Sequence, residues 1–299
     1  MEQPSYGARR LNGPFSNSWV LVRGGGDLVS GPIQRLRWAG FPVIVAELPE
    51  PRVVRRLVSF ANAVYEGTCE VEGTTAKLVP TLQEARQFIA TTPDGVPVMI
   101  DPQARAIREL QPTILLDGRM AKGPSDTRLD QAPVVIGMGP GFIAGVDVHA
   151  VVETKGGSQC GRVYYEGGAI EDTGIPCVSS GYRQERVLRA PVSGTFEACR
   201  EIGEMVEAQE TVGWIQAGAR RVPVKAQISG LLRGLLHSGV GVEAEVKVGD
   251  IDHRGESSDC CRVSEKADSV AAGVLEAILH LSIRRQIDLT QPLIQLTRA

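Results

Sequence analysis

The chain has 299 residues, of which 42 % are hydrophobic and 22 % are charged, and its formal net charge is −3. This length predicts about two domains, and the composition is that of an ordinary globular protein. The small negative charge excludes the basic field by which proteins attract nucleic acid or an anionic membrane surface. No apolar run approaches the roughly 20 residues that span a bilayer, and the N-terminal region has no signal-peptide core. We therefore expect a cytoplasmic protein.

The first half alternates strand-like and helix-like segments. Residues 19–23 form a short apolar run that stops at a glycine cluster, and residues 28–40 carry apolar side chains at helical spacing. Further strands are predicted at 43–47, 96–100, 113–117 and 133–137, and further helices at 52–64, 81–91 and 103–110. This order is typical of a parallel sheet covered on both faces by helices. We predict a Rossmann-like domain over residues 19–185.

The glycine cluster follows the first predicted strand and consists of Gly24, Gly25 and Gly26, with Asp27 next. In parallel sheets, ligands bind beyond the carboxyl ends of the strands. Glycines at such an end let backbone N–H groups and a helix N-terminus approach a phosphate. The spacing departs from the fingerprint G-x-G-x-x-G, because Val29 stands at the third glycine position. We predict that the cluster binds a nucleotide-type ligand.

Glu47 ends the second predicted strand, 21 residues after Gly26. An acidic side chain at this place typically accepts ribose hydroxyls and repels a 2′-phosphate, which favours an NAD-like ligand over NADP. The alternative is a solvated strand end ahead of Pro49 and Pro51. The sequence leaves both interpretations open.

Two more strand ends should lie at the same edge. One leads from Asp117 into a polar loop that reaches Lys122, and the other carries Gly137, Gly139 and Gly141. Glycines in the second loop either line a backbone concavity for an anion or serve only tight turning.

Asp147 and His149 share a face if residues 149–154 form a strand. Such a pair would orient the imidazole for acid–base chemistry, and the alternative is a buried structural histidine. The candidate catalytic residues are thus Asp27, Lys122 and His149. No metal site is predicted, because the six cysteines and four histidines show no ligand spacing and a structural zinc site needs about four clustered ligands.

The second half contains an internal repeat of two copies. Residues 188–215 match residues 224–251 without a gap, at an offset of thirty-six residues. The pattern predicts two halves of a small β-domain, over residues 186–254, and it resembles the barrel-sandwich hybrid of biotinyl and lipoyl domains. Those domains carry their cofactor on a lysine at the hairpin between the halves.

The corresponding hairpin here has no lysine. It contains Arg220 and Arg221, and Lys225 already lies in the following strand. Arginine keeps its proton in proteins and cannot be acylated in this way. We therefore expect no biotin or lipoate attachment. A C-terminal segment, residues 255–299, follows this domain, and its apolar helix at 271–285 is expected to dock on the α/β domain or on a partner.

Several ordered blocks resemble the YqeB-type proteins of the selenium-dependent molybdenum hydroxylase system. They extend from about Trp19 to about Leu281 and include VLVRGGGDLVSGPIQRLRWAGFPVIVAE, VYEGTCEVEG, PVVIGMGPGFIAGVDVHAVVETKGG and GVGVEAEVKVGDIDHR. The resemblance implies an accessory role in maturing a molybdenum hydroxylase and a Rossmann-like part similar to that of the XdhC maturation factors. It implies no catalytic residue.

The sequence thus predicts a molybdenum-hydroxylase maturation factor that binds NAD or a nucleotide-bearing molybdenum cofactor at the glycine-rich edge. The expected partners are the hydroxylase or its maturation factors, with no nucleic acid and no membrane; a homo-oligomer is left open. Two alternatives remain. One is an NAD-dependent oxidoreductase with Lys122 or His149 as proton donor, and the other is a non-catalytic interaction scaffold.

Overall fold

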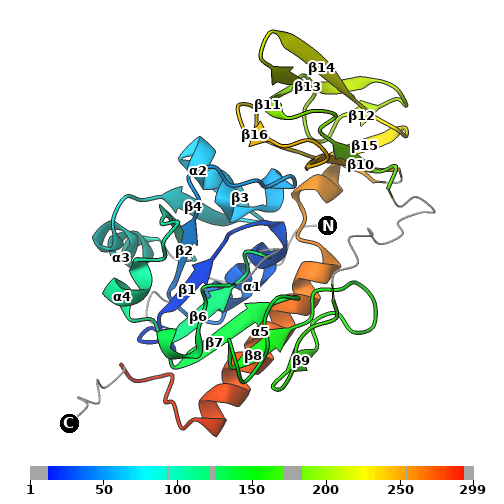
Figure 1. Cartoon of the computed structure of the whole chain (residues 1–299). Coiled ribbons are helices and arrows are strands. Elements are labelled where there is room, and N and C mark those ends of the chain that lie inside the picture. Colours follow the sequence, from blue (N-terminus) through cyan, green and yellow to red (C-terminus); the bar gives the residue numbers. More distant parts are fainter. Residues whose placement is uncertain (1–12, 93, 121–124, 172–183, 254, 293–299) are drawn as a thin grey trace.

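A nine-stranded sheet forms the centre of the molecule, and two four-stranded sheets form a separate unit at one end, the β unit (Figure 1). The computed structural model describes residues 13–92, 94–120, 125–171, 184–253 and 255–292. The main sheet has the order β3-β4-β5-β2-β1-β6-β7-β8-β9. Its strands are β1 (Val20–Arg23), β2 (Val43–Glu47), β3 (Thr68–Val71), β4 (Thr74–Leu78), β5 (Val96–Ile100), β6 (Ile114–Asp117), β7 (Val134–Met138), β8 (Ala150–Val152) and β9 (Val163–Tyr164).

Helices cover both faces of this sheet. The α-helices are α1 (Asp27–Trp38), α2 (Ala63–Glu66), α3 (Leu82–Thr91), α4 (Ala106–Leu110) and α5 (Glu265–Arg284); the short 3-10 helices are η1 (Arg56–Val58), η2 (Phe60–Asn62), η3 (Leu129–Gln131) and η4 (Ser257–Cys261). Among the described helices, none combines the length and the apolar character needed to cross a membrane.

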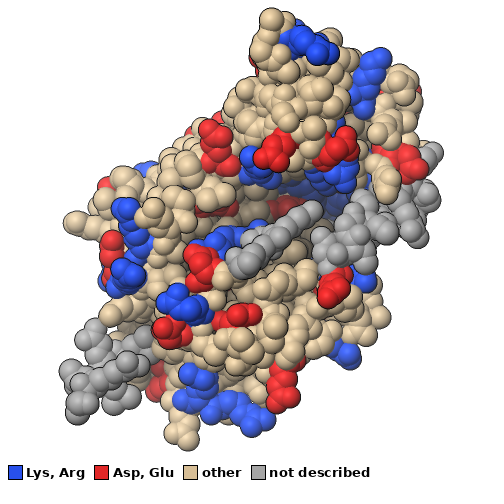
Figure 2. Space-filling view, in the orientation of Figure 1, with Lys and Arg blue, Asp and Glu red and all other residues tan. Residues whose placement is uncertain are grey.

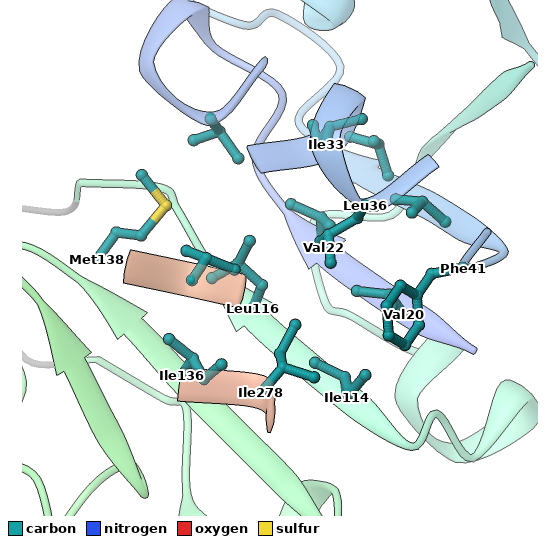
Figure 3. Close-up of a cluster of buried hydrophobic side chains, with 14 of the residues drawn as sticks. Val20, Val22, Ile33, Leu36, Phe41, Ile114, Leu116, Ile136, Met138 and Ile278 are labelled. Carbon is teal, nitrogen blue, oxygen red and sulfur yellow. The ribbon is translucent and has the colours of Figure 1, made fainter. Parts of the chain in front are cut away.

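The alternation of side chains along the strands divides the core into two layers. Val20 and Val22 of β1 join the apolar cluster beneath α1 and α5, while Leu21 joins the cluster on the other face, as the period of two along a strand requires. Figure 3 shows Ile278 of α5 beside side chains of the central strands. The expected docking of the C-terminal helix on the α/β part is confirmed, although the helix begins at Glu265 rather than at residue 271.

The β unit shows how the duplicated segment folds. Its strands are β10 (Val187–Arg189), β11 (Gly194–Ala198), β12 (Met205–Val206), β13 (Thr211–Ala217), β14 (Arg220–Lys225), β15 (Gly230–Leu235), β16 (Gly241–Val242) and β17 (Lys247–Asp252). The two sheets have the orders β10-β17-β15-β12 and β14-β13-β11-β16. The offset of thirty-six residues carries β10, β11, β12 and β13 onto β14, β15, β16 and β17 and therefore relates one sheet to the other.

The predicted fold class, a Rossmann-like parallel sheet followed by a barrel-sandwich hybrid, is wrong. The main sheet is mixed, because β3 and β9 run antiparallel to their neighbours at its two edges. The described residues between β6 and β8 contain no α-helix, so this half is not wound by successive crossover helices. Its face is covered instead by α5, which comes from the far end of the chain. The second half consists of two separate antiparallel sheets.

The predicted helix over residues 52–64 is also wrong, because contacts with the β unit determine its backbone. The segment forms η1, η2 and the start of α2. The Leu235 N–H of β15 donates a hydrogen bond to the Val54 carbonyl at 2.9 Å, and the Arg56 Nε donates to the Leu235 carbonyl at 2.9 Å. A continuous helix would use the Val54 carbonyl internally.

A glycine in α1 allows this helix to pack closely against α5. A Cβ on Gly31 of α1 would lie 2.6 Å from the Ala267 carbonyl oxygen of α5. We expect Gly31→Val to lower the free energy of unfolding by about 3 kcal/mol, because the backbone must shift to admit the side chain. Urea denaturation measures the change.

Gly241→Val is the matched control, because a Cβ there meets nothing within 4 Å. It should change stability by less than about 0.5 kcal/mol. Equal stability of the two variants would contradict the close packing of α1 on α5.

Candidate functional site

The carboxyl ends of the parallel strands bring the predicted site residues to one edge of the sheet. Arg23 ends β1 and is aligned with Asp117 at the end of β6, which in turn is aligned with Gly137 of β7. Glu47 ends β2 on the other side of β1. The glycine cluster between β1 and α1 therefore lies between Glu47 and Asp117.

Two of the three clustered glycines have structural roles. Gly24 has a φ of +87°, in the region that residues with a side chain rarely adopt. A Cβ on Gly25 would lie 3.0 Å from the Ala61 nitrogen, and the Gly25 carbonyl accepts a hydrogen bond from that same N–H at 2.9 Å. Backbone conformation therefore favours glycine at position 24, and close packing favours it at position 25.

Gly26 differs from its neighbours because neither conformation nor packing requires glycine there. It is the N-cap of α1, with φ −65° and ψ 173°, and within the described residues this helix has no side-chain cap. A Cβ added to Gly26 would meet only a Val53 methyl, at 3.7 Å. The N-terminus of α1 is thus open above Gly26, and helix N-termini attract anions through their N–H groups and dipole.

Glu47 joins the end of β2 to the glycine turn. Its carboxylate is only 7 % exposed and accepts hydrogen bonds from the Gly25 N–H at 2.6 Å and from the Leu48 N–H at 2.8 Å. Burial raises the pKa of Glu47, and the two N–H donors oppose that shift. The alternative of a solvated strand end is wrong, because the side chain is buried. The ribose-binding role remains a prediction.

Asp117 lies at the centre of a buried ion network. It accepts two hydrogen bonds from the Arg119 guanidinium, at 3.0 and 2.7 Å, one from the Arg119 backbone N–H at 3.2 Å and one from Thr127 at 2.6 Å. Arg23, also buried, pairs with Asp126 through two hydrogen bonds of 2.9 Å. Burial by itself would raise the pKa of Asp117, but the hydrogen bonds from Arg119 and Thr127 outweigh it and hold the pKa below its usual value. The network fixes the loop after β6 against the end of β1.

The second glycine-rich segment begins in β7 and continues into the loop after it. Its glycines are explained by backbone conformation or by close packing. Gly139 has a φ of +76°, and a Cβ there would lie 2.6 Å from the Thr154 Oγ1; a Cβ on Gly137 would overlap the Phe142 ring. Gly141 has a φ of +102°. These are the requirements of a tight turn. An anion-binding role for the loop remains a prediction.

Asp147 and His149 each accept a hydrogen bond from a different backbone N–H group, and a catalytic role for the pair remains a prediction. Asp147 accepts a hydrogen bond from the Ile143 N–H at 2.9 Å, and the His149 Nδ1 accepts one from the Val135 N–H at 2.9 Å. Burial, with a contribution from Arg285, lowers the pKa of His149 to about 4, so the ring is neutral at pH 7. His149 precedes β8 and therefore lies toward the amino end of that strand, away from the glycine turn.

Asp27 is the candidate catalytic residue that does lie at the glycine turn. It begins α1, its side chain is 43 % exposed, and its carboxylate lies 3.8 Å from the Arg55 guanidinium. Lys122 lies outside the described residues. Within those residues, no group of three or more His, Cys, Asp or Glu side chains is placed to hold a metal ion.

Arg55 was missed by the sequence analysis. It lies in the segment between β2 and η1, it is 9 % exposed, and it also donates to the Arg262 carbonyl at 3.1 Å. The only signal for it in the sequence is the pair Arg55-Arg56 after two valines, which is equally typical of a helix. A hollow of about 960 Å³ lies elsewhere, beside α4 and η3.

The fold and the site together define a protein with a mixed α/β sheet, a glycine turn at its carboxyl edge and an attached β unit. No protein-family model matches the chain. It is 42 % identical over 268 residues to a protein of Escherichia coli (strain K12) named "Uncharacterized protein YqeB", and the match covers 90 % of this chain and 48 % of the relative. The chain thus spans about half the length of this relative. The similarity supports a YqeB-type protein.

Two solved structures are also similar. One is an aspartoacylase family protein of Mesorhizobium loti, with 10 % identity, a TM-score of 0.26 and coverage of 79 % of this chain and 84 % of that chain. The other is a succinylglutamate desuccinylase/aspartoacylase of Rhodobacter sphaeroides, with 13 % identity, a TM-score of 0.28 and coverage of 80 % and 86 %. At these TM-scores, neither structure supports an assignment of activity.

The Asp117 network yields a prediction about stability and pH. Asp117→Asn leaves Arg23 and Arg119 without their buried carboxylate, and we expect a loss of about 3 kcal/mol at pH 7. The folded state holds the pKa of Asp117 below the unfolded value of about 3.9, so its contribution is complete above that value and is lost as the pH falls through the folded-state pKa. The difference between wild type and variant should therefore shrink below about pH 4.

Asp130→Asn is the control, because the pair of Asp130 with Arg128 is exposed. It should cost less than about 0.5 kcal/mol at pH 7. A pH-independent loss in Asp117→Asn, measured by urea denaturation from pH 3 to 7, would show that its carboxylate is not part of the network.

Proposed function

We propose that this protein is an accessory factor in the maturation of a molybdenum hydroxylase and that it binds a nucleotide-containing ligand at the glycine turn. The first part comes from the resemblance of the sequence blocks to the YqeB-type proteins of the molybdenum hydroxylase system, and the 42 % identity supports the likeness to YqeB alone. The second part depends on one observation, the uncapped N-terminus of α1 above Gly26.

The open space above Gly26 supports a phosphate-containing ligand. The first N–H groups of an α-helix have no partner within the helix. A Ser, Thr, Asp or Asn at the N-cap accepts from one of them, but Gly26 leaves them accessible to a ligand. Gly24 and Gly25 are held by conformation and packing. The backbone around these N–H groups is therefore already in place before a ligand binds.

The ligand that suits this edge is NAD or a molybdenum cofactor that carries a nucleotide. Its phosphates would lie against the backbone N–H groups of Gly26 and Asp27. Glu47 would accept ribose hydroxyls through the lone pairs that the Gly25 and Leu48 N–H groups leave free. The partners are the hydroxylase or its other maturation factors. An oxidoreductase function has less support, because His149 is directed into the sheet and not toward the turn.

A test uses Gly26→Asp. Aspartate is a favoured N-cap, so this variant should fold at least as well as wild type. Its carboxylate would take the N–H groups that the ligand needs and would repel a phosphate. We expect the affinity for NAD or ADP, measured by isothermal titration calorimetry, to fall by at least about tenfold.

Gly241→Asp adds the same charge at an open, exposed position of β16 and should bind like wild type. The proposal fails if Gly26→Asp is folded and binds every tested nucleotide as wild type does. It also fails if wild type binds none of them.

A further inference from the structure

The junction between the main sheet and the β unit lies next to the glycine turn. The segment from Val53 to Arg55 passes from the turn to β15, where a Cβ on Gly234 would lie 2.9 Å from a Val54 methyl and 3.2 Å from the Arg55 Cγ. Gly234 thus lets the two parts approach at backbone distance. Figure 2 shows Lys and Arg side chains gathered in the hollow between these two parts, with Asp and Glu beside them.

Three arginines from different elements lie at this junction, because Arg55 interacts electrostatically with Arg233 and with Asp250, and Arg186 pairs with the same Asp250. Arg55 precedes η1, Arg186 precedes β10 and Arg233 lies on β15. Arg186 pairs with Asp250 at 2.9 Å, and Arg233 pairs more loosely with Asp252 at 3.4 Å.

The arginines are not fully satisfied by these carboxylates. The Nε atoms of Arg55, Arg186 and Arg233 are all buried, and none has a hydrogen-bond partner in the described part of the chain. Buried polar groups normally have partners, and each exception calls for an explanation. The three Nε–H groups of this cluster are therefore donors without an acceptor among the described residues.

The positive charges at the junction also favour a bound anion. Burial lowers the pKa of Arg55, and the neighbouring charge of Arg233 lowers it further. Among the described residues, Asp27 faces Arg55, Asp250 pairs with Arg186 and Lys247, and Asp252 pairs with Arg233. An anion between Arg55 and Arg233 would relieve the repulsion between these two like charges.

We propose that Arg55 and Arg233, with Arg186 behind them, bind a phosphate or pyrophosphate group at the junction. This inference rests on the proposed function and makes it more specific, since it assigns the phosphate-bearing part of the ligand to both halves of the chain. Guanidinium groups bind phosphate oxygens through two parallel N–H donors, which gives orientation as well as affinity. The N-terminus of α1 lies on the same side, because Asp27 faces Arg55.

The proposed site gives the β unit a role in ligand binding. A phosphate held from both sides would couple the β unit to the main sheet, so binding would stabilise the junction. Neither half alone would bind the anion with the affinity of the whole chain.

The test measures binding of inorganic pyrophosphate to the full-length protein by isothermal titration calorimetry. We expect wild type to bind and Arg233→Gln to bind at least about tenfold more weakly, because a charge-assisted hydrogen-bonding pair is lost. Arg221→Gln is the matched control. Arg221 is on the exposed hairpin of the same β unit, where it pairs with Glu197, and its loss should leave pyrophosphate binding unchanged.

Arg233→Lys is the control for a folding defect in Arg233→Gln, because lysine keeps a positive charge opposite Asp252. It lacks the planar fork, so it should also bind more weakly than wild type while melting at a similar temperature. Wild-type affinity in both Arg233 variants overturns the proposal. No binding by wild type, or an equal loss in Arg221→Gln, overturns it as well.

Titration of ADP separates this inference from the proposed function. If Gly26→Asp loses ADP while both Arg233 variants keep pyrophosphate, the nucleotide site stands and the arginine site fails. If the Arg233 variants lose pyrophosphate while Gly26→Asp keeps ADP, the arginine site stands and the glycine turn is not the nucleotide site.

Discussion

The hydrogen bonds that the Glu47 carboxylate accepts from Gly25 and Leu48 fix the edge on which the candidate site is built. They join the ends of β1 and β2 through backbone N–H groups, so the glycine turn has one conformation. That conformation directs α1 across the face of the sheet, where it packs on α5. The open N-terminus of α1 is a consequence of this constraint, because Gly26 needs no side chain to hold the turn.

The two sides of the edge are fixed in different ways. On the β6 side, Arg23 and Asp117 belong to a network in which buried charges are paired by short hydrogen bonds, a costly arrangement unless the geometry is good. On the β2 side, the segment through Arg55 bridges to β15 by backbone hydrogen bonds. The first arrangement makes the edge rigid, and the second brings the charges of the β unit to it.

The sequence predicted the local elements better than their assembly. The strands at 43–47 and 96–100 match β2 and β5, because continuous apolar runs specify buried strands. The hairpin of β3 and β4 was not predicted, although its Glu72-Gly73 turn was a usable signal. The helix expected at 52–64 failed because Val54 and Arg56 bond to Leu235, a contact that no local pattern reveals. The arginine cluster was missed for the same reason, since its members are far apart in the chain.

The central claim is that the glycine turn holds a nucleotide-containing ligand. The most direct measurement is to denature freshly purified protein and to identify the released small molecules by mass spectrometry, in parallel for wild type and Gly26→Asp. The site described above predicts a nucleotide-bearing species from wild type that is strongly depleted in the variant. Release of no such species, or of equal amounts from both proteins, would contradict it.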